Sequence, residues 1–191
     1  LADKVVPKGT VIYGVPVLGD DNEILKYSVE DIELVNGIGS VGSLDLRTKM
    51  FEFYKRNGHT FASVIHSSAI ISKRAKLSEG IQVLAGAVIN TEVKIADNRI
   101  INTKSSIDHG CILGKHCHIA PGCTLSGCVT VGNRTHIGTG SSVIQGITIG
   151  KNVLIGAGSV VVKDIEDNSK AYGVPAKMKK ENYTKEWGGV S

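Results

Sequence analysis

An aliphatic residue occupies every sixth position from Ile65 to Val161, and this period constrains the fold more than any other feature of the chain. Two positions before it stands Ala, Ser, Thr, Cys, Val or Ile in every repeat except one, where the residue is Arg99. A period of six matches neither the 3.6-residue helical period nor the alternation of a long strand. The repeat is therefore a short strand and a corner, with both of these positions pointing inward.

Glycine marks the corners of this repeat. Of the thirteen glycines between Ser63 and Asp164, twelve follow the aliphatic residue by one or three positions, and only Gly127 does not. Glycine tolerates the positive φ angles and close backbone approach that tight corners need. Three such strands close a triangular coil, and coils stack through parallel hydrogen bonds at roughly 4.8 Å. Residues 63–164 are thus predicted to form a parallel β-helix of about five and two-thirds coils, which makes the protein mainly β.

The segment before the repeats, residues 1–62, is predicted to be a small α/β domain. Val11 to Gly19 has the composition of strands and turns, and Ser28 to Asp31 fits a capping box before a short helix. Leu44 to Asn57 is predicted to be a helix that stops at Asn57-Gly58. Four residues of this helix keep helical spacing, namely Leu46, Met50, Phe53 and Tyr54.

The repeat stops after Asp164, so residues 165–191 are predicted to form a C-terminal cap and tail. Ala171 to Lys177 is rich in turn residues, and a polar segment follows it. The end coils of a solenoid need such caps.

Composition and charge exclude several classes of partner. The formal net charge is +4 and the basic residues are scattered, apart from Lys177, Lys179 and Lys180, so we expect no nucleic-acid partner. No apolar run is long enough to cross a bilayer and no signal peptide is evident, so we expect a cytoplasmic protein. Only 5% of residues are aromatic, which suits a core of small aliphatic side chains.

Three of the four cysteines, Cys111, Cys117 and Cys123, occupy the small inward position of successive repeats. Free cysteine behaves as a small apolar residue, so this placement predicts a structural role in the core. Steps of six residues move a side chain to a different face each time, which does not suit a metal site.

Two histidines are candidates for chemistry. Asp108 and His109 fall on a corner just after the inward Ile107, so both are expected to face outward. A neighbouring carboxylate can hold the tautomer of a histidine and strengthen it as a base, although Asp108 can also be read as a corner former. His118 precedes the inward Ile119 and also points outward, but half a coil further round. A site that contains both histidines must therefore lie between subunits. For His59, His66, His116 and His136 we expect solvated positions.

Five short motifs together resemble one enzyme family: Gly14-Val-Pro-Val-Leu-Gly, Asn102-Thr, Ile107-Asp-His, His118-Ile-Ala-Pro-Gly and Gly173-Val-Pro-Ala-Lys. They are similar to the bacterial sugar acetyltransferases of the left-handed β-helix superfamily. Those most similar N-acetylate UDP-linked 4-amino sugars or O-acetylate sialic acid. The resemblance covers nearly the whole chain.

The resemblance implies a role for several residues. His109 matches the general base, His118 the histidine that contacts the acetyl carbonyl of acetyl-CoA, and Asn102 an active-site asparagine. The matching coenzyme groove is lined by Gly127, Thr139 and Ala157, and basic residues near Lys177 can meet the coenzyme phosphates. The family often has Glu or Asp directly after the base, where this chain has Gly110, so Asp108 is the adjacent carboxylate here.

The family also implies the reaction and the assembly. We expect transfer of acetyl from acetyl-CoA to an amino group of a nucleotide-linked 4-amino sugar in bacterial surface glycan biosynthesis, with no metal. The alternative is O-acetylation of sialic acid or a related sugar. A homotrimer with active sites between subunits is expected. The family begins with a strand and a Gly-rich turn of a Rossmann-like domain, which this sequence does not show, and a β-α portion of roughly 30 residues would account for the difference.

Two rival functions use similar solenoids. A class of carbonic anhydrases binds zinc between the subunits of the same prism, but it carries a His-x4-His pair, and no two histidines here are five apart. A scaffold or ice-binding solenoid would favour a flat face with a regular threonine column, which the sequence lacks.

Overall fold

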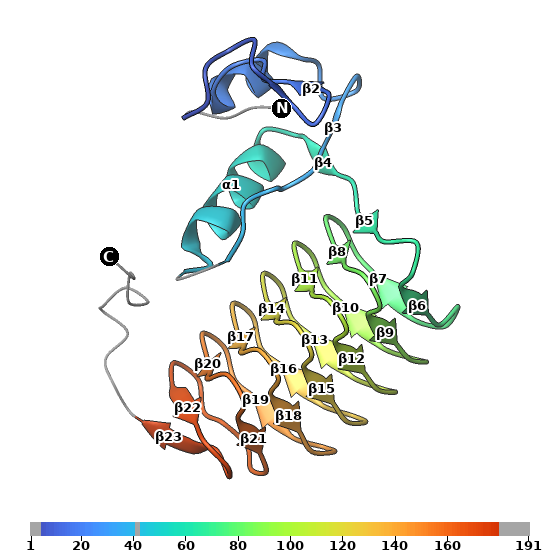
Figure 1. The fold of residues 1–191 in the computed structure, drawn as a ribbon, viewed down its shortest axis with the longest axis vertical. Coiled ribbons are helices and arrows are strands. Elements are labelled where there is room, and N and C mark those ends of the chain that lie inside the picture. The colour runs from blue at the N-terminus through green and yellow to red at the C-terminus, as the bar shows by residue number, and fades with distance from the viewer. Residues whose placement is uncertain (1–4, 41–42, 180–191) are drawn as a thin grey trace.

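The computed structural model describes residues 5–40 and 43–179, and its main body is a β-solenoid with three faces (Figure 1). Successive coils pair in parallel with a shift of eighteen residues, as where Ile101 lies beside Ile119. This shift equals three hexads, so each hexad supplies one strand and each coil visits every face once. The predicted mainly β solenoid of hexapeptide repeats is confirmed.

The strands of the solenoid are distributed over three sheets. The eight-stranded face consists of β5 (Val64–Ile65), β8 (Gln82–Val83), β11 (Ile100–Ile101), β14 (His118–Ile119), β17 (His136–Ile137), β20 (Leu154–Ile155), β22 (Lys170–Tyr172) and β23 (Lys177–Lys179). The six-stranded face consists of β6 (Ile70–Ile71), β9 (Val88–Ile89), β12 (Ser106–Ile107), β15 (Thr124–Leu125), β18 (Ser142–Val143) and β21 (Val160–Val161). The five-stranded face consists of β7 (Lys76–Leu77), β10 (Lys94–Ile95), β13 (Ile112–Leu113), β16 (Thr130–Val131) and β19 (Thr148–Ile149).

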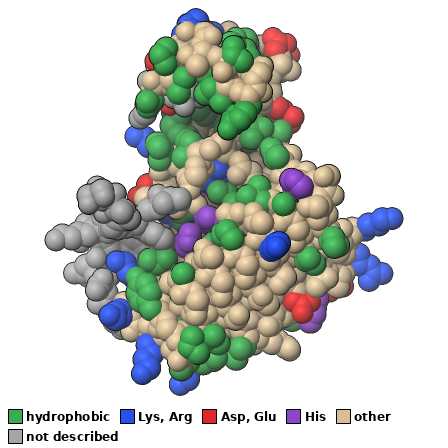
Figure 2. All heavy atoms as spheres, in the orientation of Figure 1, with side chains coloured by type: hydrophobic (Ala, Val, Ile, Leu, Met, Phe, Trp, Pro, Cys, Tyr) green, Lys and Arg blue, Asp and Glu red, His purple; other side chains and the backbone are tan. Residues whose placement is uncertain are grey.

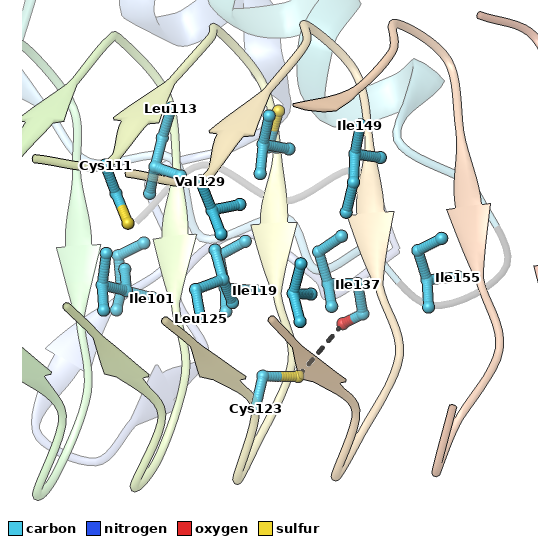
Figure 3. Packing of buried hydrophobic residues seen from close by; sticks show 14 of the residues in the cluster. Ile101, Cys111, Leu113, Ile119, Cys123, Leu125, Val129, Ile137, Ile149 and Ile155 are labelled. Atoms are coloured by element: carbon cyan, nitrogen blue, oxygen red, sulfur yellow. Dashed lines mark hydrogen bonds between the residues drawn. The ribbon is translucent and has the colours of Figure 1, made fainter. Parts of the chain in front are cut away.

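The aliphatic residues of the repeat form continuous columns inside the prism. Ile101, Ile119, Ile137 and Ile155 stack along one such column and are each 0% exposed (Figure 3). At roughly 25 cal/mol per Å² of buried apolar surface, such columns are the main source of stability. The aliphatic residue of the repeat is less well buried in the first coil, where Ile65 is 50% exposed.

The small inward positions are filled as expected, with one costly exception. Cys111, Cys117 and Cys123 are buried free thiols, which confirms their core role, and the Cys123 thiol lies 3.5 Å from the carbonyl oxygen of Ile137 (Figure 3). Arg99 is also fully buried, and its Nε and both Nη atoms have no hydrogen-bond partner among the described residues. Burial lowers the pKa of Arg99, an effect that Cys117 and Asp97 oppose.

The N-terminal part begins with an antiparallel hairpin of β1 (Val11–Ile12) and β2 (Val15–Pro16), which agrees with the predicted strands and turn. A 3-10 helix, η1 (Asp21–Lys26), follows, and Asp20 caps its first turn. The helix predicted after Ser28 is wrong. Ser28 accepts a hydrogen bond from the backbone N–H of Glu30 at 3.3 Å and closes a turn that leads into a strand instead.

One β-α-β unit joins this part to the solenoid. Strand β3 (Glu33–Leu34) pairs in parallel with β4 (Thr60–Phe61), and α1 (Asp45–Arg56) connects them. The helix matches the predicted segment, with Leu44 and Asn57 as its caps. Of the four residues with helical spacing, Tyr54 and Met50 do lie on the packed face, but Leu46 and Phe53 do not. Phe51 is 3% exposed, whereas Leu46 and Phe53 are 51% and 37% exposed.

Helix α1 runs along the corner between the five-stranded and eight-stranded faces, so it meets one coil after another. Its contacts with this corner are Lys55 with Glu79, the Arg47 carbonyl with Asn98, Glu52 with His116, and Asp45 with Arg134. Three of the corner partners are spaced eighteen residues apart, which is one coil per contact. The helix therefore fixes the N-terminal part against the solenoid.

The C-terminal end of the solenoid is closed by β22 and β23, which form an antiparallel hairpin with Ala171 opposite Met178. The predicted polar tail from residue 180 onward lies outside the described residues. Among the described residues, no helix is both long and apolar enough to cross a bilayer.

Candidate active site

His109 lies on the corner between β12 and β13, and its side chain is exposed as predicted. The ring rests over the backbone of the next coil at Gly127. A Cβ atom added to Gly127 would lie 2.5 Å from Nε2 and 2.6 Å from Cε1 of His109. This explains why Gly127 departs from the glycine columns of the repeat: its missing side chain leaves space for the imidazole.

Asp108 lies at the same corner, and its side chain contacts the backbone of His109. Its Oδ1 accepts hydrogen bonds from the backbone N–H of His109 at 2.7 Å and from Nδ2 of Asn90 at 3.0 Å. Among the described side chains, the carboxylate of Asp108 makes no hydrogen bond with the imidazole ring of His109. The geometry therefore favours Asp108 as the residue that shapes the corner under His109.

His118 is the centre of a second group, on the eight-stranded face. Its Nε2 lies 3.0 Å from Nδ2 of Asn102, its Nδ1 makes a hydrogen bond with Oγ of Ser40, and its ring packs edge-on against His136. The ring points away from the prism axis as expected, yet it is only 7% exposed because the loop before α1 covers it. Burial, with smaller contributions from His136 and Arg47, lowers the pKa of His118 to about 3.

The predicted solvation of the remaining histidines is correct only for His66, which is exposed. His116 is 6% exposed because α1 covers it, and its Nε2 lies 2.9 Å from Oε1 of Glu52. His59 is 2% exposed beside Tyr54. His136 is half-buried, and burial lowers its pKa to about 4. The hexad count describes the prism alone, so it cannot detect burial beneath a second segment.

The coenzyme-groove candidates fall on different sides of the prism. Thr139 and Ala157 are exposed on the corner that follows the eight-stranded face, one coil apart, and Lys177 is exposed in the terminal hairpin. Gly127 instead lies beside His109. On the face that Figure 2 shows, the histidine side chains at the surface lie in separate places rather than in one cluster.

The predicted site residues therefore form two separate groups within one chain. His109, Asp108 and Gly127 lie on the corner between the six-stranded and five-stranded faces. His118 lies on the eight-stranded face, and Asn102 lies on the corner just after it. In a three-sided prism, a corner between two faces is opposite the third face, so one protomer cannot bring its own two groups together.

A cavity of about 770 Å³ opens in the N-terminal part. It lies between the loop after β3 and the residues of η1, α1 and β4, and its lining includes Tyr27, Asn36, Met50, Tyr54 and Phe61. This volume and largely apolar lining are typical of small-molecule sites. No group of three or more His, Cys, Asp or Glu side chains within the described ranges is placed to hold a metal ion.

Sequence reasoning did not identify Ser40 as a site residue. The contact between Ser40 and His118 joins residues 78 positions apart and depends on how the loop before α1 crosses the solenoid. A local motif carries no signal of such a contact.

Fold and site together define a hexapeptide-repeat transferase. A family model described as bacterial transferase hexapeptide (six repeats) matches residues 128–163. Perosamine N-acetyltransferase from Caulobacter crescentus, solved as a histidine-to-asparagine variant with CoA and GDP-perosamine, is 40% identical. That match covers 90% of this chain and 81% of the other, with a TM-score of 0.84.

The acetyltransferase domain of PglB from Neisseria gonorrhoeae, in complex with acetyl coenzyme A, is 32% identical over 93% of this chain and 84% of its own, with a TM-score of 0.86. WeeI from Acinetobacter baumannii has the same fold at 23% identity, over 90% of this chain and 82% of its own, with a TM-score of 0.81. The chain belongs to the family of β-helical, CoA-dependent sugar N-acetyltransferases that includes the Caulobacter enzyme. The family expected from the sequence is confirmed.

Proposed function

We propose that this protein transfers the acetyl group of acetyl-CoA to the amino group of a nucleotide-linked 4-amino sugar, as a step in bacterial surface glycan biosynthesis. The observation that carries the proposal is the exposed imidazole of His109, seated on Gly127 at a corner of the solenoid. Relatives of the same fold have been solved with CoA and GDP-perosamine or with acetyl coenzyme A, which supports the same two classes of ligand here.

In the proposed reaction His109 acts as the general base. It takes a proton from the sugar amine as the nitrogen attacks the thioester carbonyl, with no acyl-enzyme intermediate. As the carbon–sulfur bond breaks, His109 returns this proton to the sulfur, so CoA leaves as the thiol. Asp108 holds the backbone N–H of His109 and so fixes the corner that carries the base. The amide of Asn102, which contacts Nε2 of His118, stabilises the oxyanion that forms on the acetyl group.

The proposed assembly is a homotrimer, because each site needs the His109 corner of one subunit and the His118 face of another. The coenzyme would lie along the groove between two left-handed prisms, past Thr139 and Ala157, with its phosphates near Lys177.

Residues 63–164 and the cap from residue 165 supply this catalytic part. Residues 1–62, with the cavity beside Tyr27 and Asn36, would belong to a Rossmann-like domain that holds the nucleotide sugar. The cytoplasm, where both substrates are made, is the proposed location.

The experiment that tests the function is acetyl transfer from acetyl-CoA to a panel of UDP-, GDP- and dTDP-linked 4-amino sugars and to sialic acid, followed by mass spectrometry. We expect a mass gain of one acetyl group on at least one amino sugar. His109→Ala should lower kcat by about 100-fold or more, because a general base contributes 10²–10⁴-fold. His66→Ala, which alters an exposed histidine of the first coil, is the matched control. Acetylation of sialic acid alone would overturn the proposed N-acetylation, and normal turnover by His109→Ala would overturn the role of the base.

A further inference from the structure

Residues 35–40, which follow β3, form an arm that crosses the eight-stranded face and ends at Ser40. Nη1 of the buried Arg47 donates to the carbonyl oxygens of Asn36 and Ile38, at 2.7 Å each. Nε2 of Gln82 donates to the same Asn36 oxygen at 2.6 Å, and Nδ2 of Asn36 donates to Oδ1 of Asn98 at 3.2 Å. These buried bonds hold the arm against the solenoid, so the position of Ser40 over His118 is fixed by contacts remote from the site.

The orientation of the Asn102 side chain is fixed as well. Its Oδ1 accepts a hydrogen bond from the backbone N–H of Thr103 at 2.7 Å and lies 3.3 Å from the Thr103 hydroxyl. A flipped amide would turn Nδ2 toward that N–H, which would place donor against donor. The atom that faces Nε2 of His118 at 3.0 Å is therefore the amide nitrogen of Asn102, which can only donate.

This donor favours one tautomer of His118, and Ser40 supplies the acceptor that the proton of this tautomer needs in a buried position. Because Asn102 donates to Nε2, this ring nitrogen must carry the lone pair, and the proton of the neutral ring sits on Nδ1. Nδ1 faces Oγ of Ser40, which is 2% exposed, so the imidazole donates to the serine oxygen. The doubly protonated ring would direct an N–H at the Asn102 amide hydrogens. The lowered pKa of the buried ring, about 3, agrees with a neutral imidazole.

We propose that Ser40 is a positioning residue that holds His118 as the Nδ1–H tautomer, so that His118 acts in acetyl transfer as a hydrogen-bond acceptor for Asn102. The proposal rests on the proposed acetyltransferase function and assigns roles within that site. Both ring nitrogens of His118 are engaged by protein atoms, so the group that can donate to an acyl oxygen is the Asn102 amide rather than the imidazole. The arm also lines the N-terminal cavity through Asn36 and Ile38, so it links that cavity to the acyl site.

The test is the tautomer of His118 in the full chain, read from long-range ¹H–¹⁵N spectra of histidine-labelled protein, with the His118→Asn variant to assign the signals. Wild type should show the proton on Nδ1. Ser40→Ala should move the ring toward the Nε2–H tautomer and lower kcat by about tenfold or more, with the KM for acetyl-CoA little changed. Ser40→Thr, which keeps the hydroxyl group, should retain the wild-type spectrum and rate.

A second variant keeps the test decisive if Ser40→Ala does not fold. Asn102→Asp replaces the donor with an acceptor, so the proton of His118 should move to Nε2 even with Ser40 in place. A wild-type ring protonated on Nε2, or a spectrum and kcat unchanged in Ser40→Ala, would overturn the proposal. Because the spectra need no substrate, they report on the tautomer even if no sugar in the panel is acetylated, and the two failures can be told apart.

Discussion

At the scale of single residues, the proposed base depends on a glycine in the neighbouring coil. Gly127→Ala would place a methyl group 2.5 Å from Nε2 of His109 and must displace the ring. We expect kcat to fall by about 100-fold, close to the loss of the base itself, with little change in thermal stability. In the His109→Ala background, Gly127→Ala should cost nothing further, and steady-state kinetics of the four proteins test this. Additive losses would show that Gly127 acts through something other than the ring.

Burial of the Arg99 guanidinium group should cost the folded protein a large amount of free energy. This guanidinium group is fully buried with no hydrogen-bond partner among the described residues. Replacing even a buried ion pair by apolar side chains of similar volume is often neutral or stabilises a protein by about 1–4 kcal/mol, and an unpaired buried charge is more costly still. Arg99→Met should therefore raise the free energy of unfolding in urea. Arg47→Met is the matched control: it should destabilise the protein, because Arg47 donates to two carbonyl oxygens of the arm.

The two adjacent histidines, His118 and His136, should make stability depend on pH. Burial lowers the pKa to about 3 in His118 and about 4 in His136, against 6.5 for an unperturbed ring. The unfolded chain then binds more protons below pH 6.5, so the free energy of unfolding falls as the pH decreases toward 4. The expected loss is up to about 2 kcal/mol per ring between pH 6.5 and 5. Urea unfolding at several pH values measures it, and His136→Gln should show a shallower dependence. An unchanged slope in that variant would mean that His136 is protonated in the native state.

At the scale of elements, Phe51 anchors α1 through aromatic contacts. Phe51 packs on Phe61 with ring centroids 4.5 Å apart and meets the edge of His116. Phe51→Ala should lower stability by about 3–5 kcal/mol, whereas Phe53→Ala in the more exposed position should cost much less. Hydrogen exchange should then increase in α1, β3 and β4 while the coils from β11 to β21 stay protected. Equal losses in both variants would contradict this packing.

The elements also show which features of the fold could be predicted from the sequence alone. The solenoid follows from a period repeated in every hexad, and α1 begins and ends within one residue of the predicted limits because helical spacing and the Asn57-Gly58 stop are local signals. The packed face of α1 was predicted only in part, at Met50 and Tyr54. Its other contacts could not be predicted, since the partners Glu79, Asn98, His116 and Arg134 come from successive coils. The role of Ser40 and the burial of His59 could not be predicted for the same reason, because these contacts are made between segments that are distant in the chain.

At the scale of the whole molecule, the proposed catalytic groups are on opposite sides of a rigid prism. The corner that carries His109 joins the six-stranded and five-stranded faces, while His118 projects from the eight-stranded face. The continuous aliphatic columns between them leave no route for the two groups to approach within one chain. Catalysis by both groups therefore requires that coils of different subunits lie side by side, and closed cyclic symmetry would give every subunit the same environment.

Subunit mixing tests this arrangement. His109→Ala and His118→Ala should each be inactive, because each removes one half of every site. When the two variants are co-refolded in equal amounts, a site works only where an intact His109 meets an intact His118 from the neighbour, so about one quarter of wild-type activity should return. Mixing His109→Ala with Gly127→Ala should restore nothing, since both changes damage the same half. If the two histidines acted within one protomer, the first mixture would also stay inactive, and the intersubunit site would be wrong.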